Sequence, residues 1–434
     1  MTRNRRSDKN NGVNVFLYFA AVIVHITSVI VGIIFTWSTP VTPKLENVVD
    51  NPLGFQLSVD QSSWVASLAS LGAVVGPFLG GYLGDKIGRK QSCISTTIVT
   101  GASFALLAFA KNLYLFYVLR FIAGICMGVL LTIIPIYVVE IAEIHNRGKL
   151  GGFYGVFLAV GQIFCFAVGP YTSIQTFSLL CIIFPAIFVV ICILFIPESP
   201  CYLIMKGKHE EAEEALKKLR RNCNVDDELV ALTATVKESL ANSGGISDIF
   251  RTKYLRNGLM ISAGLMIIQQ IAAISVILFY MQGIFESSGS SMPKEIGTLI
   301  VGIVQFIATL VSSSIVDKLG RRPLLLISTS VSCLSLLTLS LYFYLKITID
   351  VSSIAWLPLV TLMVYIFFYN LGIGPMPVTI LEPFGAHRSR RQNACYSVKS
   401  NKHFSFEEYP DMAERPRPKK TAAVEESQKG YENS

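Results

Sequence analysis

Two adjacent glutamines, Gln269 and Gln270, lie in the middle of an otherwise apolar segment, residues 257–281. A carboxamide donates and accepts hydrogen bonds and carries no charge. In apolar surroundings such a side chain faces a cavity with a ligand in it or bonds to a neighbouring helix. The pair is therefore a candidate site for a neutral, hydroxyl-rich molecule, with an interhelical amide bond as the alternative.

A charged loop motif occurs twice in the chain. Asp85-Lys-Ile-Gly-Arg89 and Asp317-Lys-Leu-Gly-Arg321 share the pattern D-K-x-G-R at a separation of 232 residues. Glycine permits a tight reversal, and arginine can bind a carboxylate through two parallel hydrogen bonds. A recurrence at this distance indicates a duplicated half, with a plain positively charged loop as the alternative.

Further charged residues at the ends of apolar segments could form a gate together with the two loops. They are Glu140, Arg147, Glu198 and Glu382. One exposed ion pair contributes only about 0–1 kcal/mol. A network of pairs can nevertheless bias two states that differ by a few kcal/mol. Anchoring at a membrane interface is the alternative for each residue.

Apolar segments position all of these side chains. The chain has 434 residues, of which 52% are hydrophobic and 15% charged, whereas about a quarter of a soluble domain is charged. A spanning helix needs about 20 mostly apolar residues. Ten segments qualify: 13–36, 64–84, 92–110, 113–139, 149–169, 176–196, 257–281, 296–316, 324–345 and 356–380. The sequence therefore predicts an all-α membrane protein with about ten transmembrane helices.

The basic residues set the expected orientation. Of the 37 Lys and Arg residues, 32 fall in segments on one side of the ten spans and 4 on the other. Positive charge favours the cytosolic side, so both termini are expected in the cytosol. The expected domains are a cytosolic N-terminus (1–12), a six-helix bundle (13–196), a cytosolic helical linker (197–256), a four-helix bundle (257–384) and a cytosolic disordered tail (385–434).

Other classes of chemistry find little support in the sequence. The net charge of +8 comes from clusters between apolar segments, which indicates membrane topology rather than nucleic-acid binding. No metal-ligand spacing, phosphate-binding loop or hydrolase elbow occurs in a plausible context, so neither an enzyme nor a cofactor is expected. His25 is expected to pack as a neutral side chain rather than relay protons, and Arg120 to extend outward from its span.

The motifs together resemble those of the sugar porter family of the major facilitator superfamily. The further motifs are Arg120-x-x-x-Gly124, Pro135-Ile-Tyr-Val-Val-Glu140, Pro197-Glu-Ser-Pro200 and Gly372-x-Gly-Pro375-Met-Pro377. Within the family, Trp37-Ser-Thr-Pro40 is most similar to insect facilitated trehalose and hexose transporters. The resemblance covers residues 13 to about 384 and implies a major facilitator fold with a sugar site between two helical halves.

The resemblance also implies site residues. Gln269 and Gln270 match family sugar ligands, Ser275 stands where the family has Asn, and Tyr280 matches a Tyr at the outer gate. For Tyr280, anchoring at the membrane interface is the alternative. The charged residues named above lie in or next to motifs that resemble the family's. The expected partners of the protein are a small-molecule sugar and the lipid bilayer; the oligomeric state is left open.

Besides Ser275, two positions depart from the family pattern. Gly155 stands where the family has a sugar-binding Gln in the fifth span. Gln162 lies seven residues later, two turns away on the same helix face, and could supply the missing amide, with helix packing as the alternative. Val378 replaces the family's sugar-stacking Trp.

The expected mode of transport follows from the carboxylates. The ten spans hold no Asp or Glu away from their ends, whereas proton-driven porters need a titratable group inside the membrane. The sequence therefore favours uniport of trehalose or a hexose by alternating access, at the plasma membrane.

The end of the chain raises a second hypothesis. The family has twelve spans, and the last two are expected to be missing here. The alternative to a transporter is therefore a truncated, non-transporting regulator, sensor or inert isoform.

Overall fold

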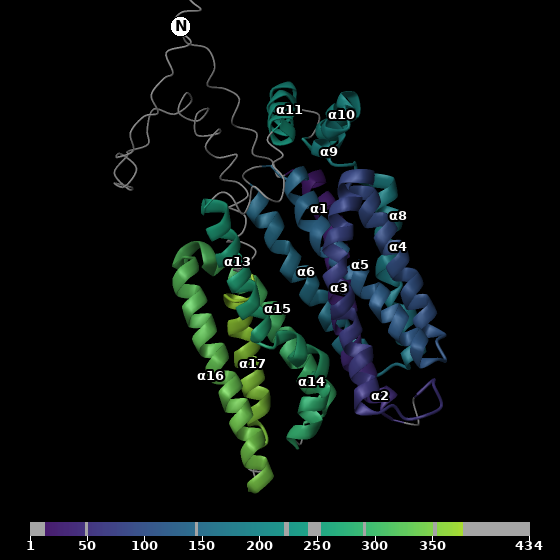
Figure 1. Ribbon diagram of the computed structural model, residues 1–434, viewed down its shortest axis with the longest axis vertical. Coiled ribbons are helices and arrows are strands. Elements are labelled where there is room, and N and C mark those ends of the chain that lie inside the picture. The colour runs from purple at the N-terminus through teal and green to yellow at the C-terminus, as the bar shows by residue number, and fades with distance from the viewer. Residues whose placement is uncertain are drawn as a thin grey trace, which may run out of the picture. The chain divides into compact units, whose positions relative to one another are not determined.

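The computed structural model describes residues 14–47, 51–143, 146–220, 225–241, 253–289, 292–349 and 354–375, which form helices and no strand (Figure 1). The first half contains α1 (Val15–Thr36), α2 (Ser38–Leu45), α3 (Val59–Ile87), α4 (Arg89–Ala108), α5 (Leu113–Ile141), α6 (Arg147–Val168), α7 (Ile174–Cys181) and α8 (Ile183–Phe195). Three short helices follow: α9 (Pro200–Met205), α10 (His209–Leu219) and α11 (Asp226–Ala241). The second half contains α13 (Lys253–Ile271), α14 (Ile274–Ser288), α15 (Lys294–Leu319), α16 (Arg321–Thr348) and α17 (Leu357–Leu371).

Nine helical stretches among the described residues are long and apolar enough to cross a membrane. They correspond to the first nine predicted spans, with α1–α2, α7–α8 and α13–α14 each counted as one stretch. The tenth predicted span, 356–380, appears as the apolar 15-residue helix α17, and residues beyond 375 lie outside the described part. The all-helical fold is confirmed.

The chain divides into two compact units, Met1–Glu382 and Pro383–Ser434. The second unit lies outside the described residues, as does the predicted tail. The other predicted domain boundaries stay predictions.

Glycines bring the helices of the first half into close contact. A Cβ added to Gly124 of α5 would lie 2.1 Å from the Ala69 carbonyl oxygen of α3. A Cβ on Gly161 of α6 would lie 2.1 Å from the Val29 carbonyl oxygen of α1. Small residues let helix backbones approach this closely, which is how apolar helices associate inside a membrane. Since α1 and α6 are in contact on these faces, their other faces pack on further helices, α1 on α5 and α6 on α15.

The two halves meet at different heights. Helix α6 packs on α15, and α2 packs on α14 together with the end of α1, which contains Phe35. At the second contact the Thr39 hydroxyl donates to the Leu278 carbonyl oxygen at 2.5 Å, and the Phe35 and Phe279 rings lie 5.0 Å apart. We call this set, Phe35, Thr39, Leu278 and Phe279, the α2–α14 contact.

Helices α9–α11 cover one end of the first half, which we call the linker end (Figure 1). Asn14, which caps α1, donates from Nδ2 to the Leu219 carbonyl oxygen of α10 at 2.6 Å. The Arg220 guanidinium bonds both the Ile141 carbonyl oxygen at 3.0 Å and Glu228 of α11 at 2.9 Å. The short helices are therefore anchored to α1 and α5 by specific polar contacts.

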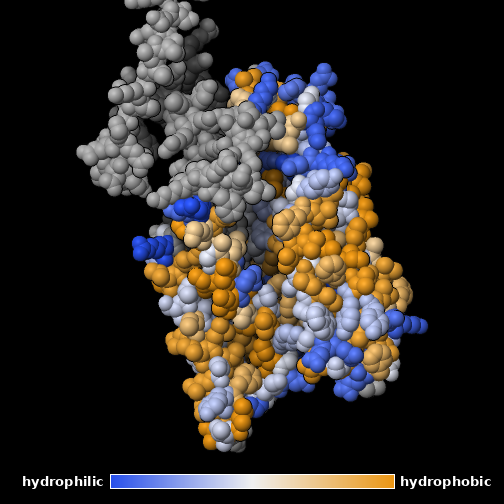
Figure 2. All heavy atoms as spheres, in the orientation of Figure 1, coloured by the Kyte–Doolittle hydropathy of each residue, from blue (hydrophilic) through white to orange (hydrophobic). Residues whose placement is uncertain are grey.

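The sides of the bundle are apolar and its ends are polar. Figure 2 shows hydrophobic residues over most of the visible helical surface and hydrophilic residues over α9–α11 and at the opposite end. Phe78 of α3, for example, is 81% exposed. This distribution suits a protein whose sides face lipid tails and whose ends face water.

Candidate functional site

Gln162 lies on α6 inside the bundle and is 1% exposed. Its backbone nitrogen lies 3.3 Å from the position that a Cβ on Gly32 of α1 would occupy. Its side-chain Oε1 has no hydrogen-bond partner within the described residues. A buried acceptor without a partner costs about 1–3 kcal/mol, so the position suits a residue that binds a ligand donor.

Gln305 on α15 lies at the same level of the α6–α15 interface. On one side of Gln305 along α15, a Cβ added to Gly302 would lie 2.7 Å from the Phe166 ring of α6. On the other side, the Thr309 side chain would lie 2.8 Å from a Cβ added to Gly155 of α6. The two helices therefore run antiparallel, and Gln305 falls opposite the Gln162 region. Gln305 is 5% exposed, and its Oε1 lacks a hydrogen-bond partner in the part of the chain that the structure describes.

Gln305 was not among the residues expected from the sequence. The available signal is that it is the one amide in the apolar span 296–316. That signal does not say which face of the helix the amide occupies. Its pairing with α6 depends on the close contact at Gly302.

The adjacent glutamines of α13 have different environments. Gln269 donates from Nε2 to the Gly374 carbonyl oxygen at 2.8 Å, beyond the end of α17. Gln270 is exposed. Gln269 thus makes the interhelical amide bond that was the alternative to ligand binding, whereas Gln270 remains accessible to a ligand.

Ser275 and Tyr280 lie beyond a helix break. Ala273 has φ +62°, a left-handed conformation that is unfavourable for a residue with a Cβ, and it separates α13 from α14. The Tyr365 hydroxyl of α17 donates to the neighbouring Ala272 carbonyl oxygen. Ser275 and Tyr280, on α14, are both partly buried, and Tyr280 follows directly after the α2–α14 contact.

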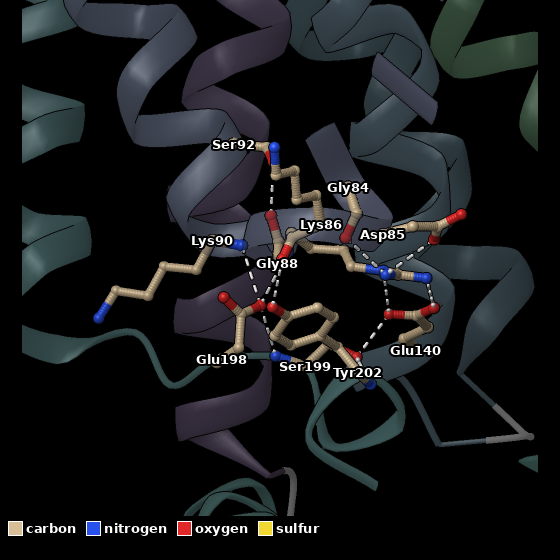
Figure 3. Close-up of polar contacts among 11 residues, drawn as sticks. Gly84, Asp85, Lys86, Gly88, Lys90, Ser92, Glu140, Glu198, Ser199 and Tyr202 are labelled. Carbon is tan, nitrogen blue, oxygen red and sulfur yellow. Dashed lines mark hydrogen bonds and ion pairs between the residues drawn. The ribbon is translucent and has the colours of Figure 1, made fainter. Parts of the chain in front are cut away.

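Arg89 is the centre of a charged cluster at the linker end, and Figure 3 shows the surrounding Asp85, Glu140, Glu198 and Ser199. Its guanidinium lies 3.1 Å from Glu140 through both Nε and Nη2, and 3.3 Å from Asp85 through Nη1. Nη1 also donates to the Gly84 carbonyl oxygen at 2.7 Å. The Ser199 hydroxyl donates to Glu140 Oε2, the oxygen nearest Arg89 Nε, at 2.5 Å. The predicted gate residues Asp85, Arg89 and Glu140 therefore form one network.

Glu198 caps helix α4 from a distant part of the chain. Its Oε1 accepts the backbone N–H groups of Arg89 and Lys90, each at 3.0 Å, and of Ser199 at 2.9 Å (Figure 3). The first N–H groups of a helix lack partners within it, and the helix dipole favours an anion there. Glu198 therefore locks the segment before α9 onto the start of α4.

Gly88 makes this capping possible. It has φ +101°, and a Cβ at this position would lie 2.4 Å from Glu198 Oε2. Glycine alone combines that backbone conformation with the space for the carboxylate.

The remaining predicted gate residues lie outside the described network. Arg147 is exposed and forms no ion pair with a described residue. Asp317 lies in the last turn of α15 and Arg321 begins α16, but their side chains are outside the described part, as is the whole of Glu382.

The sequence-based prediction for Arg120 is wrong. The side chain does not extend outward but is 0% exposed. Its Nε donates to the Val65 carbonyl oxygen at 3.1 Å, and Nη1 donates to that of Ile34 at 3.0 Å. The guanidinium carbon lies 5.1 Å from the centre of the Trp37 ring. Because α1 ends at Thr36, Arg120 meets unpaired carbonyl groups and the negative end of the helix dipole.

His25 is buried and packed, as expected. Nε2 lies 2.9 Å from the Leu150 carbonyl oxygen, Nδ1 lies 3.2 Å from the Ser28 hydroxyl, and the ring stacks on Phe157. Both ring nitrogens are thus engaged by structural partners. Across the described residues, no group of three or more His, Cys, Asp or Glu side chains could hold a metal ion.

Comparison with known families decides the class of protein. A family model described as "Sugar (and other) transporter" matches residues 15–406. The chain belongs to the sugar transporter family. It is 35% identical over 362 residues to the facilitated trehalose transporter Tret1 of Apis mellifera ligustica, covering 82% of this chain and 71% of that protein. It is 33% identical over 365 residues to Tret1 of Bombyx mori, with 83% and 71% covered.

Solved structures support the fold of this sugar transporter. The partially occluded, inward-open xylose transporter XylE from E. coli superposes with a TM-score of 0.70 at 22% identity, covering 88% of this chain and 91% of that one. A structure of the proton:xylose symporter XylE bound to 6-bromo-6-deoxy-D-glucose gives a TM-score of 0.69 at 21% identity, covering 89% and 91%. Its family, whose model matches residues 15–406, makes this chain a multi-pass membrane transporter and not an enzyme.

Proposed function

We propose that this transporter carries trehalose or a hexose by facilitated diffusion. The observation that carries the proposal is the placement of Gln162 and Gln305, two buried amides with unpaired oxygens on the helices that join the halves. A sugar offers several hydroxyl donors and no charge, which these acceptors suit. Similarity to insect trehalose transporters supports the choice of sugar.

The binding site proposed for the sugar consists of Gln162, Gln270 and Gln305, with Ser275 and Tyr280 closing it on the side of α14. Gln269 holds the end of α17 in place and so positions the site. Alternating access rocks the two halves about the α6–α15 interface. The network of Arg89, Glu140 and Glu198 stabilises the closed state at the linker end. Arg147 at the start of α6 is its further member in the first half, and Asp317, Arg321 and Glu382 are its members in the second half.

Uniport is proposed because the described carboxylates lie at the ends of the spanning helices. Glu140, Glu143, Glu286 and Glu295 are examples. Without a titratable group at the sugar site, a proton has no place to bind along the transport path. The proposed location is the plasma membrane, with the linker end in the cytosol.

Uptake of radiolabelled trehalose and glucose into vesicles tests this function. Vesicles that contain wild-type protein should bring one of these sugars to the same concentration inside and outside, with or without an uncoupler. Gln270→Ala should reduce the rate of uptake at low sugar concentration. Accumulation above equilibrium that an uncoupler abolishes would contradict uniport. Sugar binding without any uptake would instead favour a non-transporting sensor.

A further inference from the structure

A polar cavity lies near the end of the bundle opposite the linker end. Its volume is about 540 Å³, within the range of about 300–1,000 Å³ that is typical of ligand pockets. It is lined by Pro43, Glu46, Asn47, Gln56, Gly283, Glu286, Ser287 and Lys294. Helix α2 and the loop after it supply four of these residues, and α14 with the start of α15 supplies the others. Both halves of the transporter therefore build this cavity, which we call the vestibule.

The vestibule is separated from Gln270 by the α2–α14 contact. Along α14, Leu278 and Phe279 of that contact come first, and the lining residues Gly283, Glu286 and Ser287 follow over the next two turns. Gln270 lies before the contact, on α13. A molecule in the vestibule is thus outside the closed contact, and a molecule at Gln270 is inside it.

The lining favours a neutral ligand with many hydroxyl groups. Glu286 pairs with Lys294 at 2.6 Å, and Glu46 accepts the Ser62 hydroxyl at 2.5 Å. Each carboxylate has further acceptor sites, since two oxygens offer about four lone pairs. The exposed Gln56 amide can both donate and accept. Two negative charges against one positive charge disfavour an anionic ligand, and the polar lining disfavours an apolar one.

We propose that the vestibule is a second sugar-binding site, which holds a disaccharide such as trehalose on the path to Gln270. The proposal rests on the proposed function for the chemical class of its ligand. Because α2 and α14 belong to different halves, separation of these helices opens the α2–α14 contact and widens the vestibule in the same movement. The sugar bound there is then released toward the glutamines rather than captured from dilute solution.

Protection of an introduced cysteine tests the proposal. Ser287→Cys changes one atom at the vestibule, and Gln175→Cys places a control thiol at an exposed position of α7 that does not line it. The purified full chain is treated with a maleimide with and without trehalose, and labelling of each introduced cysteine is measured by mass spectrometry. Glycerol at equal osmolarity controls for viscosity. Calorimetry with the same sugar measures binding independently.

We expect trehalose at ten times its Kd to slow labelling of Ser287→Cys about tenfold. The protection should persist in Ser287→Cys combined with Gln270→Ala, and Gln175→Cys should not be protected. If calorimetry detects sugar binding that Gln270→Ala removes, while Ser287→Cys is never protected, the vestibule proposal is wrong and the proposed function stands. If sugar neither binds nor protects, both are wrong.

Discussion

At the scale of the residue, the Gln162 and Gln305 amides of α6 and α15 are expected to contribute to the affinity for sugar. Gln162→Ala and Gln305→Ala each remove an acceptor from the proposed site. A sugar hydroxyl left unpaired in a desolvated pocket costs about 1–3 kcal/mol, so affinity should fall about 5- to 150-fold. Calorimetry of trehalose or glucose binding measures the change.

Asn370→Ala is the matched control for these variants. The Asn370 amide donates to the Ile366 carbonyl oxygen of its own helix at 2.8 Å. Its loss should change sugar affinity less than about twofold, because that donor is already satisfied within α17. Equal effects of Asn370→Ala and Gln305→Ala would show that the α6–α15 amides do not bind sugar.

Arg120 is expected to stabilise the folded protein. Replacing it with Ala removes two hydrogen bonds from a charged donor, each contributing about 1.5–3 kcal/mol, and leaves the Val65 and Ile34 carbonyl groups without this donor. The free energy of unfolding should fall by about 3 kcal/mol or more, measured by thermal unfolding in detergent. Arg147→Ala, at an exposed arginine, should stay within about 0.5 kcal/mol of wild type. Similar losses at the two positions would argue against the buried geometry of Arg120.

At the scale of the element, the repeated loops offer a matched pair of glycines. Gly88 has φ +101° with Glu198 against it, whereas Gly320 has φ +79° with no described atom within 4 Å of an added Cβ. Gly320→Ala should therefore cost only the backbone strain, about 1–3 kcal/mol, because φ +79° with ψ 160° is a conformation almost exclusive to glycine. Gly88→Ala should cost at least about 2 kcal/mol more, because it also displaces the carboxylate from the N-terminus of α4.

The free energy of unfolding of the two glycine variants distinguishes these contributions. A second change tests the cause: Glu198→Ala should make the additional cost of Gly88→Ala disappear, since the two changes affect the same contact. Independent, additive costs would mean that Glu198 does not cap α4.

At the scale of the whole molecule, two exposed lysines test the orientation. Lys111 precedes α5 at the end opposite the linker end, and Lys237 lies on α11. A membrane-impermeant amine reagent on intact cells should label Lys111 and leave Lys237 unlabelled, because the positive charges favour a cytosolic linker end. Permeabilised cells should show both labels. Labelling of Lys237 in intact cells would reverse the proposed topology.

The amino-acid sequence by itself determines the class of this protein. Apolar segments of about 20 residues specify spanning helices wherever they occur, because an unpaired backbone is too costly in lipid. The first nine predicted spans accordingly appear as helical stretches. The repeated loop and the family motifs are also local patterns, readable within short stretches of chain. The Arg89–Asp85 pair belongs to this group, since the two residues are only four positions apart in the sequence.

The tertiary structure decided what each polar side chain does inside the bundle. Whether Gln269 binds ligand or the Gly374 carbonyl oxygen depends on where α17 ends beside α13, 105 residues along the chain. Arg120 is buried because α1 ends where its guanidinium can reach the Ile34 carbonyl oxygen, 86 residues away. Gln305 gains its place at the interface from the packing of α15 on α6. A hydrogen bond depends on distances of a few tenths of an ångström, and only the packing of distant helices sets those distances.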